Sequence, residues 1–193
     1  GLVLFAHGSG SSRLSPRNRH VASVLHGAGL ATLLVDLLTP GEEALDERTR
    51  ALRFNIRLLE QRLVGCIDWL LQRPDASELR IGCFGASTGA AAALVAAAER
   101  PTVVHAVVSR GGRPDLAEGR LEEVLAPTLL IVGGNDTEVI SLNEQALRAL
   151  RCEKQLEIVP GATHLFEERG ALDRVAELAR DWFAQYLGRP ANA

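Results

Sequence analysis

A serine stands between two glycines in the run Gly85-Ala86-Ser87-Thr88-Gly89. An apolar stretch from Leu79 to Phe84 precedes this run, and an alanine-rich stretch follows it. In the Gly-x-Ser-x-Gly pattern a serine projects from a sharp turn between a strand and a helix. Glycines two residues before and after the serine remove the Cβ atoms that would collide with neighbouring backbone. The pattern makes Ser87 the candidate nucleophile; the alternative is a tight turn with a buried hydroxyl.

A serine hydroxyl is a poor nucleophile at neutral pH, so it needs a base, and the base needs an acid to orient it. The best-placed histidine is His164, which lies in a Gly-Ala-Thr-His loop between the last predicted strand and the last predicted helix. The alternative for it is a loop histidine that caps that helix. We expect His20 and His26 on a helix surface, His105 inside a strand, and His7 as a structural residue that hydrogen-bonds its own loop.

The candidate acid is Asp136, which follows Gly133-Gly134-Asn135 at the end of a predicted strand. An aspartate in a turn is common in itself, so a purely structural role is the alternative. Its place between nucleophile and base in the chain favours the catalytic role, and Asp115 is the backup candidate. The order Ser87, Asp136, His164 is that of the nucleophile, acid and base in the α/β-hydrolase arrangement.

The composition excludes several classes of function. The chain has 193 residues, 47% of them hydrophobic, which is enough for one domain with a sizeable core. A formal net charge of −3 gives no indication of nucleic-acid binding. No apolar run is long enough to span a membrane and no signal peptide is visible, so we expect a cytoplasmic protein. Cys66, Cys83 and Cys152 fit no metal or disulfide pattern and are interpreted as small apolar residues.

The elements that must position these residues alternate between strand and helix. Each of the candidates Ser87, Asp136 and His164 follows a predicted strand, and there are no hairpin signals between them. This order predicts one α/β domain over 1–193, with a mostly parallel sheet of about six strands covered by helices on both faces. The strands are expected at 1–6, 30–38, 79–84, 102–108, 128–132 and 155–159, and the helices at 16–27, 55–72, 88–99, 116–125, 141–150 and 170–187. Residues 42–53 are charged and predict a loop with a short helical piece.

The chain resembles the α/β-hydrolase superfamily, and within it the small, lidless serine hydrolases similar to dienelactone hydrolase. The resemblance covers essentially the whole chain and rests on four motifs, at 7–10, 85–89, 133–136 and 161–164. It implies that the backbone N–H groups of Ser9 and Thr88 form the oxyanion hole. The namesake enzymes use a cysteine nucleophile where this chain has Ser87, so their lactone substrate is not carried over. The family also begins with strands before the one at Gly1, so N-terminal strands are expected to be missing.

Four arginines lie near the predicted site. Arg110 and Arg113 are placed on a short loop after the fourth strand, where many relatives insert a lid, and Arg13 and Arg17 follow the His-Gly loop. They could recognise an anionic group of the substrate, Arg110 in particular. The alternative is a set of solvated charges. Without a lid, the site is expected to be open and to suit small or exposed acyl groups.

The leading hypothesis is a serine hydrolase that cleaves a carboxylic ester of a small molecule, with no metal and no organic cofactor. Acyl transfer to an acceptor other than water uses the same first step and remains open. A non-catalytic binding module of the same fold is a further alternative. A dinucleotide-binding domain is disfavoured, because Arg13 stands where the third glycine of that motif belongs and no phosphate-binding Gly-Lys-Ser/Thr loop is present. The oligomeric state is left open.

Overall fold

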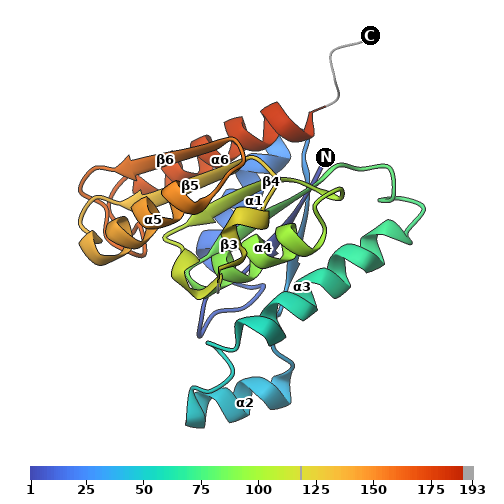
Figure 1. Ribbon diagram of the computed structural model, residues 1–193, viewed down its shortest axis with the longest axis horizontal. Coiled ribbons are helices and arrows are strands. Elements are labelled where there is room, and N and C mark those ends of the chain that lie inside the picture. Colours follow the sequence, from blue (N-terminus) through green and yellow to red (C-terminus); the bar gives the residue numbers. More distant parts are fainter. Residues whose placement is uncertain (118, 189–193) are drawn as a thin grey trace.

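The structure is a computed structural model, and it describes residues 1–117 and 119–188 (Figure 1). The strands are β1 (Leu2–Ala6), β2 (Ala31–Val35), β3 (Ile81–Ala86), β4 (Val104–Arg110), β5 (Thr128–Gly133) and β6 (Lys154–Val159). The α-helices are α1 (Pro16–Gly27), α2 (Pro40–Thr49), α3 (Ile56–Leu71), α4 (Thr88–Glu99), α5 (Thr137–Ala149) and α6 (Ala171–Leu187). Two short 3₁₀ helices, η1 (Pro114–Ala117) and η2 (Arg120–Glu123), lie between β4 and β5.

The six strands form one parallel sheet in the order β2-β1-β3-β4-β5-β6, which confirms the predicted sheet. The pair β1 and β3 has strands on both sides: β2 lies next to β1, and β4, β5 and β6 follow β3. Loops that leave the carboxyl ends of two such strands diverge, and in open α/β sheets ligands bind in the crevice between them. Here the diverging segments are the loop after β1, which starts at His7, and the turn after β3, which carries Ser87.

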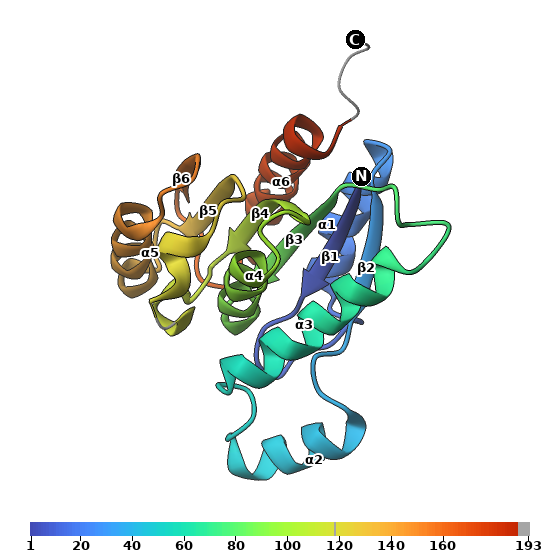
Figure 2. The same ribbon diagram turned by 45° about the vertical axis from the view of Figure 1, so that its right-hand side comes forward.

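Helices cover both faces of the sheet, as Figures 1 and 2 show: α1 and α6 lie side by side on one face, and α3 and α4 on the other. Alternate residues of β1 enter different cores. Leu2 and Leu4 pack with α3 and α4, whereas Val3 and Phe5 pack with α1 and α6. A strand buried on both faces must be apolar throughout, which explains the unbroken apolar run at the start of the chain.

Helix α4 runs directly behind the candidate nucleophile and is buried along almost its whole length. Its residues from Thr88 to Ala98 are all buried, and most of them are alanines. Small side chains let the helix backbone approach the sheet closely. The N-terminus of α4 is thereby fixed at the crevice, next to Ser87.

The charged segment after β2 differs from the prediction, because it forms a full helix. Thr39 caps α2 by accepting a hydrogen bond from the backbone N–H of Glu42, and the Glu42 side chain accepts one from the backbone N–H of Thr39. This capping box specifies a helix start without any apolar residue. Asp46 is the buried residue of α2, so the helix has no apolar face for a sequence pattern to reveal. Figure 2 shows α2 standing away from the sheet, below α3.

Two further boundaries differ in ways that affect the site. The sequence predicts Ser109 and Arg110 in a loop, but β4 continues through both because they pair with β3 and β5. The expected helix at 116–125 is replaced by η1 and η2. No helix within the described residues is long and apolar enough to cross a membrane.

Candidate active site

Ser87 occupies a strained turn between β3 and α4. Its backbone angles are φ 51° and ψ −120°, a region that non-glycine residues rarely adopt and that costs on the order of 1–3 kcal/mol. A Cβ added at Gly85 would lie 2.4 Å from the Cα of Ala90, and one added at Gly89 would lie 2.3 Å from the carbonyl oxygen of Ala6. Both glycines of the pattern are therefore required by close backbone approach, as the sequence predicts.

The Ser87 hydroxyl is not used to hold the turn together. Ser87 is the N-cap residue of α4, yet its side chain makes no capping hydrogen bond, and it lines a cavity instead. Its backbone is fixed on both sides: the N–H donates to the carbonyl of Arg110 at 3.2 Å, and its carbonyl accepts from Ala90 and Arg113. The hydroxyl is thus held in place by backbone contacts and remains available for chemistry.

The nearby thiol of Cys83 does not compete with Ser87 for the nucleophile role. Cys83 lies in β3, fully buried in the core shared with α3 and α4. Burial raises the pKa of this thiol to about 12, so it carries no thiolate at neutral pH. Together with the position of Cys83 inside the sheet, this leaves Ser87, in the turn after β3, as the nucleophile candidate.

Asp136 and His164 are in direct contact. The Nδ1 atom of His164 lies 2.6 Å from Oδ2 of Asp136, and the carboxylate is more deeply buried than the imidazole. A carboxylate accepts a hydrogen bond from a protonated Nδ1. In that tautomer Nε2 of the ring carries no proton and can act as a base. The backup acid Asp115 instead forms two hydrogen bonds with Arg113, at 2.9 and 2.7 Å. Of the two predicted acids, only Asp136 is paired with His164.

The loops that carry Asp136 and His164 are tied to each other. Asn135 donates from its backbone to the carbonyl of Ala162 and from its side chain to the carbonyl of Gly161, both at 2.9 Å. A Cβ at Gly133 would lie 2.4 Å from the Ala162 oxygen, so the glycine permits this close approach. The Gly-Gly-Asn-Asp motif therefore positions the acid and also anchors the loop of the histidine.

Glu168 supports the same loop from the other side, and no motif in the sequence predicts this role. Its carboxylate accepts hydrogen bonds from the backbone N–H and the hydroxyl of Thr163, at 3.0 and 2.7 Å. These bonds lower the pKa of Glu168 below its ordinary value. A charged, hydrogen-bonded glutamate thus holds the residue that precedes His164.

Three of the remaining histidines have other partners, whereas His105 lies in β4, as expected, and its buried Nδ1 has no hydrogen-bond partner among the described residues. His7 accepts a hydrogen bond at Nε2 from the backbone N–H of Leu37, at 3.0 Å, so its proton is on Nδ1, 2.9 Å from the carbonyl of Gly8. This is the structural role expected for it. His20 on α1 lies 2.9 Å from Asp173 on α6, and His26 lies 2.7 Å from Thr32.

The two residues expected to supply the oxyanion hole lie next to each other. The hydroxyls of Ser9 and Thr88 are hydrogen-bonded at 3.0 Å. Gly8 brings this loop against the turn, since a Cβ added there would lie only 3.1 Å from the Cβ of Ser87. Thr88 is the first residue of α4, where backbone N–H groups have no intrahelical acceptor. Donors for a negative oxygen are thus available beside Ser87.

A cavity of about 150 Å³ brings the predicted residues together. Ser87, His164 and Ser9 all line it. Arg110, predicted on a loop, is instead the last residue of β4; it is 8% exposed and also lines this cavity, as does Arg17. The other two arginines are paired elsewhere, Arg13 with Asp36 and Arg113 with Asp115.

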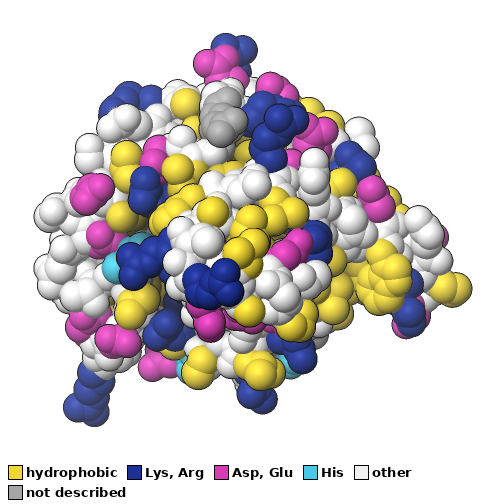
Figure 3. Space-filling view, turned by 90° about the horizontal axis from the view of Figure 1, so that it is seen from below, with side chains coloured by type: hydrophobic (Ala, Val, Ile, Leu, Met, Phe, Trp, Pro, Cys, Tyr) yellow, Lys and Arg dark blue, Asp and Glu magenta, His cyan; other side chains and the backbone are white. Residues whose placement is uncertain are grey.

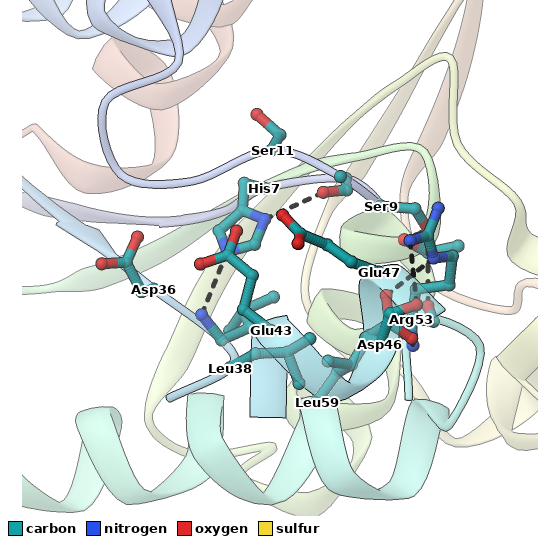
Figure 4. A pocket seen from close by; sticks show the side chains of 14 residues that line it. His7, Ser9, Ser11, Asp36, Leu38, Glu43, Asp46, Glu47, Arg53 and Leu59 are labelled. Carbon is teal, nitrogen blue, oxygen red and sulfur yellow. Dashed lines mark hydrogen bonds and ion pairs between the residues drawn. The ribbon is translucent and has the colours of Figure 1, made fainter. Parts of the chain in front are cut away.

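A second cavity of about 80 Å³ lies on the other side of Ser9 and Thr88, beneath α2 (Figure 4). His7 lies in its wall, and Figure 4 shows Glu43 and Glu47 reaching toward it from α2. This cavity was not predicted, because its cover is the helix that lacks an apolar pattern. Within the described residues no group of three or more His, Cys, Asp or Glu side chains could hold a metal ion.

The surface around this end of the molecule carries charges of both signs. Figure 3 shows the molecule from the side on which α2 lies, with basic and acidic side chains interspersed among hydrophobic ones. No extended surface of one charge forms on that face.

Comparison with known proteins places this geometry in a family. The family model described as "Dienelactone hydrolase family" matches residues 9–187. The crystal structure of a dienelactone hydrolase from Anabaena variabilis is 66% identical, with a TM-score of 0.95, and the match covers 97% of this chain and 87% of that one. The protein Est1E from Butyrivibrio proteoclasticus, solved with ferulic acid bound, shares the fold at 15% identity, with a TM-score of 0.81 over 97% of this chain and 90% of that one.

A curated relative from Mycobacterium tuberculosis carries the name "Putative phosphoribosyl transferase". It is 60% identical over 190 residues, which are 98% of this chain but 42% of the relative. The chain therefore spans less than half the length of that protein. The family model and the similarity to the Anabaena structure agree with the parallel sheet and helices described above. The chain has the α/β-hydrolase fold and belongs to the dienelactone hydrolase family.

Proposed function

We propose that this chain is a serine hydrolase that cleaves a carboxylic ester of a small molecule through an acyl-enzyme on Ser87. One observation carries the proposal. His164, paired with Asp136 at 2.6 Å, lines the same cavity as a strained Ser87 whose hydroxyl caps nothing. A structural serine in a turn would be expected to use its hydroxyl for the turn.

In the proposed reaction Ser87 Oγ attacks the acyl carbon while His164 Nε2 takes the hydroxyl proton. Asp136 holds the imidazole in the tautomer that leaves Nε2 free and stabilises the imidazolium that forms. The carbon–oxygen bond to the alcohol then breaks, and His164 returns the proton to the departing oxygen. Water, deprotonated by the same nitrogen, attacks the acyl-enzyme and releases the acid and Ser87.

The negative oxygen of each tetrahedral intermediate is proposed to lie against the backbone N–H groups of Ser9 and Thr88. Donors aimed at this position contribute about 3–4 kcal/mol each to transition-state stabilisation in serine hydrolases. The side-chain hydrogen bond between Ser9 and Thr88 supports this role, because it fixes the two donors relative to each other. No metal ion or organic cofactor takes part in the proposed reaction.

The name of the mycobacterial relative suggests a different activity. More than half of that relative lies outside the matched region. We propose that the transferase activity in its name belongs to that other part, and that the part similar to this chain is a hydrolase. The residues proposed for hydrolysis here all lie within the span that the dienelactone hydrolase model matches.

The test is covalent labelling with a fluorophosphonate probe, followed by hydrolysis of short 4-nitrophenyl esters. Wild type is expected to be labelled and to turn over the esters, whereas Ser87→Ala and His164→Ala should be neither labelled nor active. Ser23→Ala is the matched control, because Ser23 is exposed on α1 and should leave both readouts unchanged.

Absence of labelling in a folded wild-type protein would overturn the nucleophile role and favour the binding-module alternative. Labelling with acyl-enzyme accumulation but slow release to water would favour acyl transfer. That outcome would be resolved by adding alcohols or amines as acceptors and measuring whether product release accelerates.

A further inference from the structure

The segment 111–113, which follows β4, contacts both the turn of the candidate nucleophile and the imidazole of the candidate base. The N–H of Arg113 donates to the carbonyl oxygen of Ser87 at 3.2 Å. The N–H of Gly111 donates to the carbonyl oxygen of Ile131 in β5 at 2.7 Å. A Cβ added at Gly111, whose φ is 51°, would lie 3.4 Å from both Nδ1 and Cε1 of His164. The backbone of this segment is therefore packed against the imidazole and bonded to the nucleophile turn.

The middle of the segment is held from α5. The carbonyl oxygen of Gly112 accepts a hydrogen bond from Nδ2 of Asn143 at 3.0 Å, and the same nitrogen donates to the carbonyl oxygen of Val139, one turn earlier, at 2.8 Å. Both neighbours are acceptors, so the NH2 group of the amide, and not its oxygen, must face them. Gly112 is also confined between β4 and α4, because a Cβ there would overlap Oγ of Ser109 and lie 2.7 Å from Cβ of Ala90.

The burial of Asn143 costs stability. The residue is fully buried, and its Oδ1 atom has no hydrogen-bond partner among the described residues. An unpaired buried acceptor is unfavourable, and an apolar side chain at the same position would avoid that cost. A helix that only packs against the sheet would therefore not need an amide here. The hydrogen bond that this amide makes outside its own helix, to Gly112, gives a reason for it.

The helix that carries Asn143 also begins at the candidate acid. Asp136 is the N-cap residue of α5, and Asn143 lies about two turns further along the helix. The bond from Asn143 to Gly112 thus connects the helix of the acid to a segment that contacts the base and the nucleophile turn. The three proposed catalytic residues lie on separate loops, and this bond links the elements that support them.

We propose that Asn143 is a positioning residue, and that its hydrogen bond to Gly112 holds the segment 111–113 in place and thereby fixes the imidazole of His164 relative to the turn of Ser87. This inference rests on the proposed hydrolase function and concerns the same site. Asn143 acts through the segment and not on the substrate. A displacement of about 1 Å in the reacting groups costs about a hundredfold in rate. Loss of this bond should therefore slow the chemical steps and leave binding of the ester unchanged.

The main variant is Asn143→Thr, whose hydroxyl can still donate to the carbonyl oxygen of Val139. It keeps a bond within the helix and loses the bond to Gly112. We expect kcat for a short 4-nitrophenyl ester to fall about 10- to 100-fold with KM unchanged, and the rate of fluorophosphonate labelling to fall by a similar factor. Asn143→Ser, which has the same hydroxyl and less bulk, is the second variant in case the branched side chain prevents folding.

Ala146→Gly is the matched control. Ala146 is also buried on α5, and glycine weakens the helix while it leaves the amide of Asn143 in place. This control should unfold at a lower temperature than wild type and retain the wild-type kcat. Equal losses of kcat in Ala146→Gly and in the Asn143 variants would overturn the proposal, because they would show a general effect of helix stability. Wild-type kcat in a folded Asn143 variant would overturn it as well.

A spectroscopic readout does not depend on turnover. The proton on Nδ1 of His164 that is bonded to Asp136 should give a far-downfield resonance in the proton NMR spectrum. Asn143→Thr should shift or broaden this resonance, whereas Ala146→Gly should leave it as in wild type. An unchanged resonance in folded Asn143→Thr would overturn the positioning role. Failure of wild type to react with the fluorophosphonate would instead count against the hydrolase, and the resonance would still report whether Asn143 positions His164.

Discussion

The backbone N–H of Ser87 donates to the carbonyl oxygen of Arg110 at 3.2 Å. The residue that fixes the candidate nucleophile through its main chain also lines the cavity of Ser87 with a buried side chain, whose Nε and Nη1 atoms have no hydrogen-bond partner among the described residues. Any movement of the end of β4 would therefore shift both groups together. This coupling links the position of the carboxyl end of β4 to the chemistry proposed for the site.

Replacement of Arg110 by methionine is expected to stabilise the free protein. Exchange of a buried, unsatisfied charge for an apolar side chain of similar length is often stabilising, by about 1–3 kcal/mol. For a chain of this size each kcal/mol raises Tm by about 2–4 °C. Thermal unfolding followed by circular dichroism would measure the change, with Arg110→Lys as the comparison that keeps the charge. A lower Tm for Arg110→Met would show that the guanidinium is satisfied in the free protein.

Asp136→Asn is expected to reduce kcat on an activated ester by a factor of about 10³–10⁴, because the imidazole loses the partner that fixes its tautomer. Asp115→Asn should change kcat by no more than about threefold, because Asp115 is paired with Arg113 and not with His164. Steady-state kinetics on both variants would separate the two acids that the sequence suggests. Equal losses in the two variants would contradict the assignment of Asp136.

The sequence was sufficient to place Ser87, Asp136 and His164 at one end of the sheet. Each follows a predicted strand, and parallel strands present their carboxyl ends at one edge, so spacing and topology together predict that the three meet. The structure brings Asp136 and His164 into contact and lines one cavity with Ser87 and His164. Their catalytic roles remain a prediction for the kinetic tests.

Two features that shape the site differ from what local polarity in the sequence predicts. The pair Ser109-Arg110 resembles the start of a loop, and only pairing with β3 and β5 extends β4 through it and buries the guanidinium. Helix α2 is specified by the cap at Thr39 and by the buried Asp46 instead of an apolar stripe. In both places a polar stretch forms a regular element and buries a charged side chain, Arg110 in β4 and Asp46 in α2, so local polarity does not indicate exposure there.

The glycines of the turn give a prediction about packing. Gly89→Ala would place a methyl group 2.3 Å from the carbonyl oxygen of Ala6, a rigid backbone atom of β1. We expect a destabilisation of about 1–3 kcal/mol or more and a displaced nucleophile. Gly65→Ala in α3 is the matched control, since a Cβ there meets nothing within 4 Å. That substitution should be neutral or stabilise the protein by up to about 1 kcal/mol. Chemical denaturation measures both, and similar stability in the two variants would contradict the close approach of β1 and α4.

The charge state of Asp46 should determine how α2, which covers the second cavity, responds to low pH. Its carboxylate, 3% exposed, accepts hydrogen bonds from the backbone N–H groups of Leu52 and Arg53, at 2.8 and 2.9 Å, and from Arg53 Nε at 2.7 Å. Burial alone would raise the pKa of Asp46, but the hydrogen bonds from Arg53 and Leu52 outweigh it and hold the pKa below the ordinary value of 3.8.

A carboxylate whose pKa is lower in the folded state contributes stability above its unfolded pKa and loses that contribution as the pH falls through the folded value. Asp46→Asn should therefore unfold at a lower temperature than wild type at pH 7, and the difference should shrink as the pH is lowered below about 4. Asp75→Asn is a control from an exposed pair, for which the difference at pH 7 should be small. A difference between wild type and Asp46→Asn that stays constant from pH 7 to pH 3 would mean that the charge of Asp46 does not hold α2 in place.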